Sequence, residues 1–207
     1  PEAMRALFGI PEGADAASLA YGAIYAFYGA LILASFALAG GAAAIAGEER
    51  RGTAAMLLGS PVSRTRLVAA KTLALVALTA FGALLLWVAG VLSPRVLDVD
   101  VSGMTVEALL VHVFAISLFH GCLALAIGAW TGSTTAASGI TSGVLVLSFF
   151  AVGLLPLIEG AGELARVFPW YYLDAADPVR TGVHWGHVGL LLGGSALLVG
   201  AAVVGVN

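Results

Sequence analysis

One island of charge in an otherwise apolar chain constrains the fold more than any other feature of the sequence. Residues 48–71 hold five of the nine basic side chains, and uncharged stretches long enough to cross a membrane lie on both sides. In membrane proteins, short loops rich in Lys and Arg stay in the cytoplasm. The island is therefore predicted to be a cytoplasmic loop between two transmembrane helices.

The composition indicates an integral membrane protein. Hydrophobic residues make up 60% of the chain and charged residues 10%, with a mean hydropathy of +1.03, whereas soluble domains carry about 25% charged residues. A helix needs roughly 20 apolar residues to cross the hydrocarbon core, so the uncharged run 108–158 is too long for one span. The polar stretch 130–135 (WTGSTT) divides it, because irregular polar backbone cannot face lipid.

These runs predict an all-α, polytopic bundle that forms a single transmembrane domain over residues 1–207. The five expected spans lie at about 18–46, 67–92, 107–130, 137–157 and 185–206. Two glycine pairs, Gly139-xxx-Gly143 and Gly189-xxx-Gly193, would allow helices to approach closely.

The distribution of basic residues predicts the orientation. With the island inside, the outer segments carry only the four remaining basic side chains, as the positive-inside rule requires. Five spans then place the start of the chain outside, although it begins Pro1-Glu2-Ala3 without an apolar targeting segment. We therefore expect a further span upstream of residue 1. The outer segment at about 156–180 is expected to dip back toward the membrane, and an interfacial amphipathic helix fits it equally well.

The island also has a local structure of its own. A short amphipathic helix with Met56, Leu57 and Leu58 is expected to end before Pro61, because the residue before a proline disfavours the α region. Ser63 can then cap the next helix. The result is a rigid elbow over 48–66, joined directly to two transmembrane helices, that can carry a push from a cytoplasmic partner into the membrane.

Residues 47–64 read GEERRGTAAMLLGSPVSR, and a lysine follows after six more residues. This string resembles a segment of the permease subunits of type-2 ABC exporters, in which E-x-x-x-G-T, a leucine pair and P-V-S-R recur between the second and third helices. A looser similarity extends over the turn at 130–135 and over Pro169-Trp170-Tyr171-Tyr172 with Asp177-Pro178. On this alignment the five spans correspond to helices two to six of a six-helix subunit.

The resemblance implies one half of an exporter in a prokaryotic plasma membrane. A second permease subunit, identical or different, would complete the pathway, and a dimer of ABC ATPase subunits would dock on the cytoplasmic elbows. The chain has no G-x-x-x-x-G-K-[ST] phosphate loop. ATP and Mg²⁺ are therefore expected on the separate ATPase, no cofactor is expected on this chain, and its contacts are with lipid and protein rather than nucleic acid.

The elbow is the predicted dock for the ATPase. Its apolar side chains would fill a groove on the partner, while Glu49 and Arg64 would fix the register through charged hydrogen bonds. A loop that floats at the lipid surface through its arginines is the simpler alternative. The predicted coupling residues are Glu48, Glu49, Arg50, Gly52, Thr53, Met56, Leu57, Leu58, Pro61, Val62, Ser63 and Arg64.

The resemblance also implies where cargo would pass, because in that family the helices aligned with 18–46 and 137–157 line the subunit interface. Aromatic residues recur on both, and an aromatic lining suits a hydrophobic or amphiphilic cargo. A membrane-interface belt explains Tyr21 equally well. The residues predicted to line the pathway or the dimer interface are Tyr21, Tyr25, Tyr28, Ser35, Phe149 and Phe150.

Two other classes of protein remain to be weighed against an exporter subunit. An ion-coupled secondary transporter would need carboxylates deep in a span. An intramembrane enzyme would use His112 and His120, which lie eight residues apart near Cys122, and ionisable groups at membrane depth suggest function. Neutral imidazoles also simply hydrogen-bond within a helix bundle, and no metal site is predicted.

Overall fold

The structure, a computed structural model, describes residues 22–50, 63–97 and 104–206, and throughout these ranges it contains helices and no strand. The elements in chain order are η1 (Gly22–Gly29), α3 (Ala30–Ala44), α4 (Ala46–Arg50), α6 (Arg64–Leu97), α7 (Val106–Thr131), α8 (Thr134–Leu154), η2 (Leu155–Leu157), η3 (Gly162–Val167), α9 (Tyr171–Asp174), α10 (Pro178–Thr181) and α11 (Trp185–Gly205).

Within the described residues, five helical stretches are long and apolar enough to cross a membrane: Ile24–Ala44, Arg64–Val96, Val106–Thr131, Thr134–Leu157 and Trp185–Gly205. The predicted all-α class and the five spans are confirmed. The turn expected at 130–135 separates α7 from α8, where Gly132 adopts a left-handed conformation with φ 62° and the Ser133 hydroxyl accepts from the Ala136 N–H. Glycine suits the first position and serine the second.

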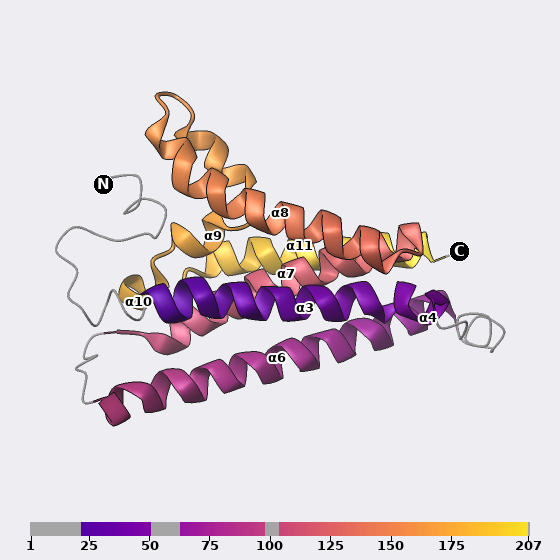
Figure 1. Cartoon of the computed structure of the whole chain (residues 1–207), viewed down its shortest axis with the longest axis horizontal. Coiled ribbons are helices and arrows are strands. Elements are labelled where there is room, and N and C mark those ends of the chain that lie inside the picture. Colours follow the sequence, from indigo (N-terminus) through magenta and orange to yellow (C-terminus); the bar gives the residue numbers. More distant parts are fainter. Residues whose placement is uncertain (1–21, 51–62, 98–103, 207) are drawn as a thin grey trace.

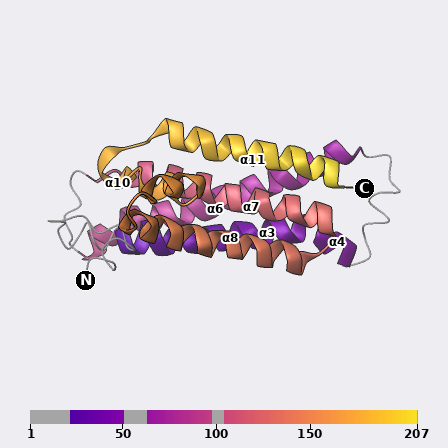
Figure 2. The same cartoon turned by 90° about the horizontal axis from the view of Figure 1, so that it is seen from above.

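Helix α7 is the centre of the bundle, with α3, α6, α8 and α11 around it (Figures 1 and 2). Of the residues in its most apolar stretch, 72% are buried inside the bundle, whereas the corresponding share in the other spans is 17–44%. Small residues make this central position possible. A Cβ added at Gly41 of α3 would clash with the carbonyl oxygen of Gly121 on α7, so only glycine allows the two backbones to approach this closely.

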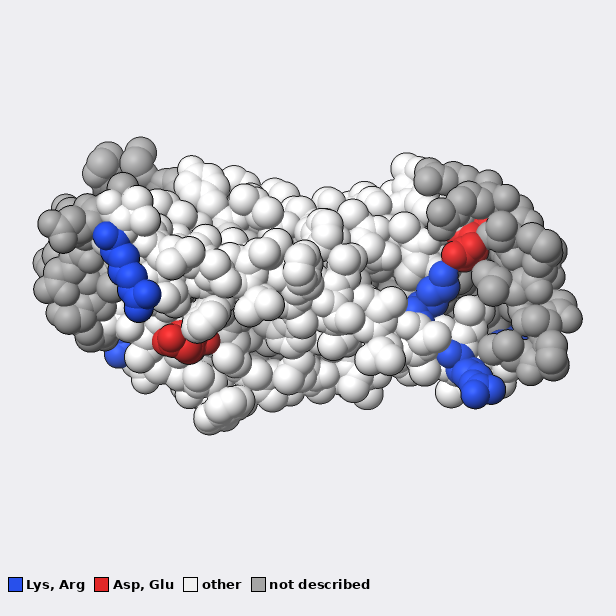
Figure 3. Space-filling model, turned by 90° about the horizontal axis from the view of Figure 1, so that it is seen from below, with Lys and Arg blue, Asp and Glu red and all other residues white. Residues whose placement is uncertain are grey.

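Charged side chains gather at the two ends of the long axis. Figure 3 shows Lys, Arg, Asp and Glu near both ends of one face and an uncharged band between them. We call the end that carries α4, Arg64 and Lys71 the α4 end, and the opposite one the hairpin end, after the hairpin of residues 155–170 that projects there (Figure 1). Large apolar side chains such as Leu73 and Phe81 are exposed between the ends, as lipid contact requires.

Candidate coupling and pathway sites

The described parts of the predicted coupling segment lie at the α4 end of the bundle. Helix α3 ends at Ala44 and α4 begins at Ala46, with a break at Ile45, where φ is −113° and ψ is −57°. The buried Ile45 side chain holds this corner against the bundle. At the other side of the segment, the Ser63 hydroxyl accepts a hydrogen bond from the Arg66 N–H at 3.3 Å. Ser63 therefore caps α6, as predicted.

An ion pair joins the two sides of the segment. Lys71 Nζ on α6 donates to Glu48 Oε1 on α4 at 2.8 Å, and the two side chains are only 27% and 20% exposed. This partial burial shields the pair from solvent screening, which reduces most surface ion pairs to about 1 kcal/mol or less. The sequence predicted Glu48 but not its partner. Lys71, the lysine that follows the segment shared with the permease family, was the sequence signal that could have indicated this partner.

Only some of the remaining predicted coupling residues lie within the part of the chain that the structure describes. Glu49 and Arg50 belong to α4, and Arg64 is exposed in the first turn of α6. Outside the described residues lie Gly52, Thr53, Met56, Leu57, Leu58, Pro61 and Val62. The coupling helix itself therefore stays a prediction.

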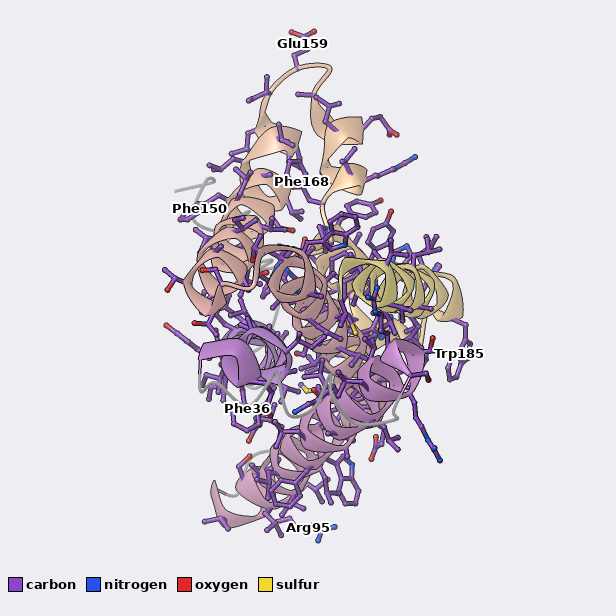
Figure 4. The ribbon with its side chains drawn as sticks, turned by 90° about the vertical axis from the view of Figure 1, so that its right-hand side faces the viewer. Phe36, Arg95, Phe150, Glu159, Phe168 and Trp185 are labelled. Carbon is purple, nitrogen blue, oxygen red and sulfur yellow. The ribbon has the colours of Figure 1, made fainter. Side chains whose placement is uncertain are left out.

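The aromatic residues predicted to line a pathway separate into two groups. Tyr28 is 53% exposed and Phe150 45%, and Ser35 is also exposed; Phe150 points away from the bundle (Figure 4). Tyr25 is buried, and its hydroxyl lies 2.8 Å from the Ser93 hydroxyl on α6. Tyr25 thus ties η1 to α6 instead of facing outward. Tyr21 lies outside the described residues.

Phe149 belongs to an aromatic cluster at the hairpin end. Its ring centroid lies 4.9 Å from that of Phe27 and 5.6 Å from that of Trp170. The Trp170 N–H also donates to the buried Ser148 hydroxyl of α8 at 2.8 Å. These contacts fasten the returning arm of the 155–170 hairpin to α8 and η1. Sequence reasoning missed Phe27 and Trp170 as partners because they lie far apart in the chain.

The 155–170 hairpin itself projects from the bundle, with Glu159 at its tip (Figure 4). Its turn includes Gly160 at φ +77°. Apolar side chains on both arms are exposed, among them Ile158, Leu164 and Val167. Exposed apolar groups of this kind suit contact with lipid at the membrane interface.

A groove lies between α3 and α8 near the α4 end, and the sequence did not predict it. Its volume is about 560 Å³, and it opens to the outside of the bundle. Small and hydroxyl side chains form its walls: Ala39, Ala42 and Ala43 from α3, and Thr134, Thr135, Ser138, Gly139 and Ser142 from α8. The spacing of the hydroxyl residues after the α7–α8 turn was the signal that could have indicated it.

The two intramembrane histidines are completely buried in α7. His112 Nδ1 lies 2.9 Å from the Ala108 carbonyl oxygen, and His120 Nδ1 lies 2.8 Å from that of Ile116. Nδ1 of each ring therefore donates to the backbone of its own helix, whereas Nε2 of both rings is buried without a hydrogen-bond partner. Among the described residues, no three His, Cys, Asp or Glu side chains are grouped so that they could hold a metal ion.

Comparison with protein families tests the resemblance seen in the sequence. The family described as ABC-2 family transporter protein matches residues 4–169, which is most of the chain. The chain belongs to the ABC-2 transporter family. This membership confirms the resemblance to type-2 ABC permeases, a class of membrane transport subunits, and it implies a partner ABC ATPase. Comparisons with curated proteins and with solved structures find no match.

The family match ends before Trp170 and so leaves out α9, α10 and α11. It includes the α4 corner, the Glu48–Lys71 ion pair and the α3–α8 groove. The described parts of the predicted coupling segment and the α3–α8 groove therefore lie within the residues that match the family.

Proposed function

We propose that this chain is the permease subunit of an ATP-driven exporter that moves a hydrophobic or amphiphilic substrate out of the cell. The observation that carries the proposal is the corner at the α4 end, in a chain of the ABC-2 family. There the predicted coupling segment begins and ends in helices that the Glu48–Lys71 pair holds together. The cell is prokaryotic, the membrane is the plasma membrane, and the α4 end faces the cytoplasm, where the charge island belongs.

The helix contacts support a route for mechanical coupling. An ATPase docked on the segment 51–62 would push on α4 and on the start of α6. Helix α4 continues into α3, and α3 packs backbone to backbone on α7 through Gly41 and Gly121. A displacement at the corner therefore moves α3 against α7 and α8, and so changes the face that α3 and α8 share. Alternating access or a gated channel would both use this motion.

The proposed transporter contains other subunits besides this chain. A dimer of ATPase subunits binds ATP and Mg²⁺, and this chain binds no cofactor. A second permease subunit, identical or different, faces the outer surface of η1, α3 and α8, where Tyr28, Ser35 and Phe150 are exposed. The aromatic part of that surface suits an apolar or amphiphilic cargo.

The distribution of carboxylates favours an exporter over an ion-coupled secondary transporter. Such a transporter needs an acidic side chain at membrane depth. Of the carboxylates in the described part of the chain, only Glu107 belongs to one of the five spans, and it is exposed in the first turn of α7.

Purification of the tagged permease from its native membranes tests the proposal. The expected result is an accompanying P-loop ATPase that is labelled by 8-azido-ATP, and whose hydrolysis in proteoliposomes is inhibited by vanadate. A permease that purifies without any nucleotide-binding chain, and whose transport follows an imposed ion gradient instead of ATP, would contradict it.

A further inference from the structure

Three of the four histidines of the chain gather at the hairpin end, and the exporter role does not use them. His184 directly precedes α11, His187 lies in the first turn of α11, and His112 is fully buried in α7, which packs against α11. The ring centroids of His184 and His187 are 4.0 Å apart. All three imidazoles are close enough that positive charges on them would repel each other.

In their neutral form, the rings fasten the start of α11 to α9. Nδ1 of His184 accepts a hydrogen bond from the His187 N–H at 3.3 Å, so this imidazole caps α11. The His187 ring bonds to the backbone of Tyr172 on α9, and its centroid lies 5.3 Å from that of the Tyr172 ring. The Tyr172 hydroxyl donates to the Arg166 carbonyl oxygen at 2.9 Å. Contacts therefore run from α11 through α9 to the 155–170 hairpin.

This arrangement does not accommodate an added proton. Once protonated, Nδ1 of His184 can no longer accept the capping bond, and a positive charge at a helix N-terminus is opposed by the helix dipole. Nδ1 of His187 and Nε2 of His112 are both buried without a hydrogen-bond partner. Protonation would turn either nitrogen into a buried donor without an acceptor, which costs free energy.

The surrounding helices supply no counter-charge. Their charged side chains at this end, within the described residues, are Glu107, Glu163, Arg166, Asp174, Asp177 and Arg180. Glu163 pairs with Arg166 at 2.8 Å, and Asp174 interacts with Asp177. Arg95 at the end of α6 is distant from Trp185, the neighbour of His184 (Figure 4). The charged groups that act on His112 and His187 are the other histidines. A charge buried without a counter-charge is costly, so protonation favours a state in which these rings reach water.

We propose that His184 and His187, with the buried His112 next to them, form a proton-sensitive latch at the hairpin end. The neutral latch holds α9 and the 155–170 hairpin on the start of α11, and proton uptake releases them. The released state binds more protons than the latched one, so release increases as the pH falls. Imidazoles usually change charge between about pH 5 and 8. His184 is exposed, which gives protons access to the latch. This regulation goes beyond the exporter role and does not depend on the cargo.

Distances between two spin labels measure the state of the latch directly. Leu164→Cys on the hairpin and Leu190→Cys on α11, both at exposed positions, are combined with Cys122→Ala, and the labelled permease is placed in phosphatidylcholine nanodiscs. Double electron–electron resonance is recorded at about pH 8 and about pH 5. We expect one narrow distance distribution at the higher pH. At the lower pH, a second and longer component should make up at least about half of the population.

Non-titratable replacements distinguish the latch from a general effect of acid. His184→Asn keeps a capping side chain, and His187→Gln keeps a donor for the α9 backbone. Together they should hold the second component below about a tenth of the population at the lower pH. His120→Gln is the matched control, because His120 is the other buried imidazole of α7 and bonds to its own helix as His112 does. Asp174→Asn tests the nearby carboxylate pair. Both controls should respond to pH as the natural chain does.

Several results would overturn the proposal. The distances could stay the same at both pH values, or the change could persist when His184→Asn and His187→Gln are combined. Loss of the response in His120→Gln or Asp174→Asn would place the titrating group elsewhere, and its loss on adding EDTA would make the cluster a metal site. The measurement needs neither ATP nor the ATPase, so a latch that fails this test leaves the exporter role intact.

Discussion

At the scale of single residues, similar side chains in one sequence pattern have different surroundings. Tyr25 and Tyr28 lie three residues apart, and both were predicted to line the pathway or the dimer interface. Yet Tyr25 is buried and bonds to Ser93, whereas Tyr28 is exposed. The difference arises from α6, which extends to Leu97 instead of ending at residue 92 as predicted. Ser93 therefore still belongs to the helix and lies within reach of Tyr25. No local pattern in residues 18–46 contains that contact, because its two partners are 68 residues apart.

The Glu48–Lys71 ion pair leads to a prediction at this scale. Glu48→Gln and Lys71→Met should each lower the thermal stability of the purified permease, because either removes one partner of a half-buried pair. Exchange of the charges, Glu48→Lys with Lys71→Glu, should restore most of the loss. A double-mutant cycle on detergent unfolding should give a coupling energy of about 1 kcal/mol. Additive effects of the single variants would show that the two side chains do not stabilise the corner together.

At the scale of elements, the hydropathy and turn signals predicted most of what the structure contains. Uncharged runs gave the five spans, and the glycine and serine of the 130–135 turn gave the division of α7 from α8. Helix packing could not be predicted in the same way. The five spans are mostly apolar all round, and lipid is as apolar as the protein core, so hydrophobic periodicity does not show which face meets another helix. The α3–α8 groove was missed for this reason.

Close packing of α3 on α7 gives the prediction for this scale. Gly41→Ala should destabilise the bundle by about 1–3 kcal/mol, the usual range for overpacking, because the new Cβ meets backbone atoms of Gly121 and Leu125 that cannot move separately. Gly40→Ala is the matched control. Its Cβ meets only the side-chain tips of Leu75 and Leu78, at 3.4 Å. Unfolding measurements that find equal stability for the two variants would contradict the close α3–α7 contact.

At the scale of the whole molecule, the chain combines a rigid centre with features for interaction at its margins. The buried α7 holds four other spans, while the corner at the α4 end, the α3–α8 face and the 155–170 hairpin lie around the outside. This arrangement suits the proposed exporter, in which force would enter at one end and act on a surface that a second subunit completes. In the sequence, the predicted coupling helix falls between α4 and α6, the helices that would receive that force.

The dock of the ATPase can therefore be tested on the assembled transporter. Leu57→Asp would put a charge into the apolar contact of the coupling helix, and Arg64→Glu would reverse a charge at its end. Each should leave the permease inserted in the membrane but weaken ATPase binding roughly tenfold or more, as loss of a central anchor does, and abolish stimulation of ATP hydrolysis. Arg66→Glu is the control, since Arg66 is also exposed in the first turn of α6 but is not among the predicted contacts. If all three variants bind and stimulate the ATPase as the natural chain does, force enters the permease at some place other than this corner.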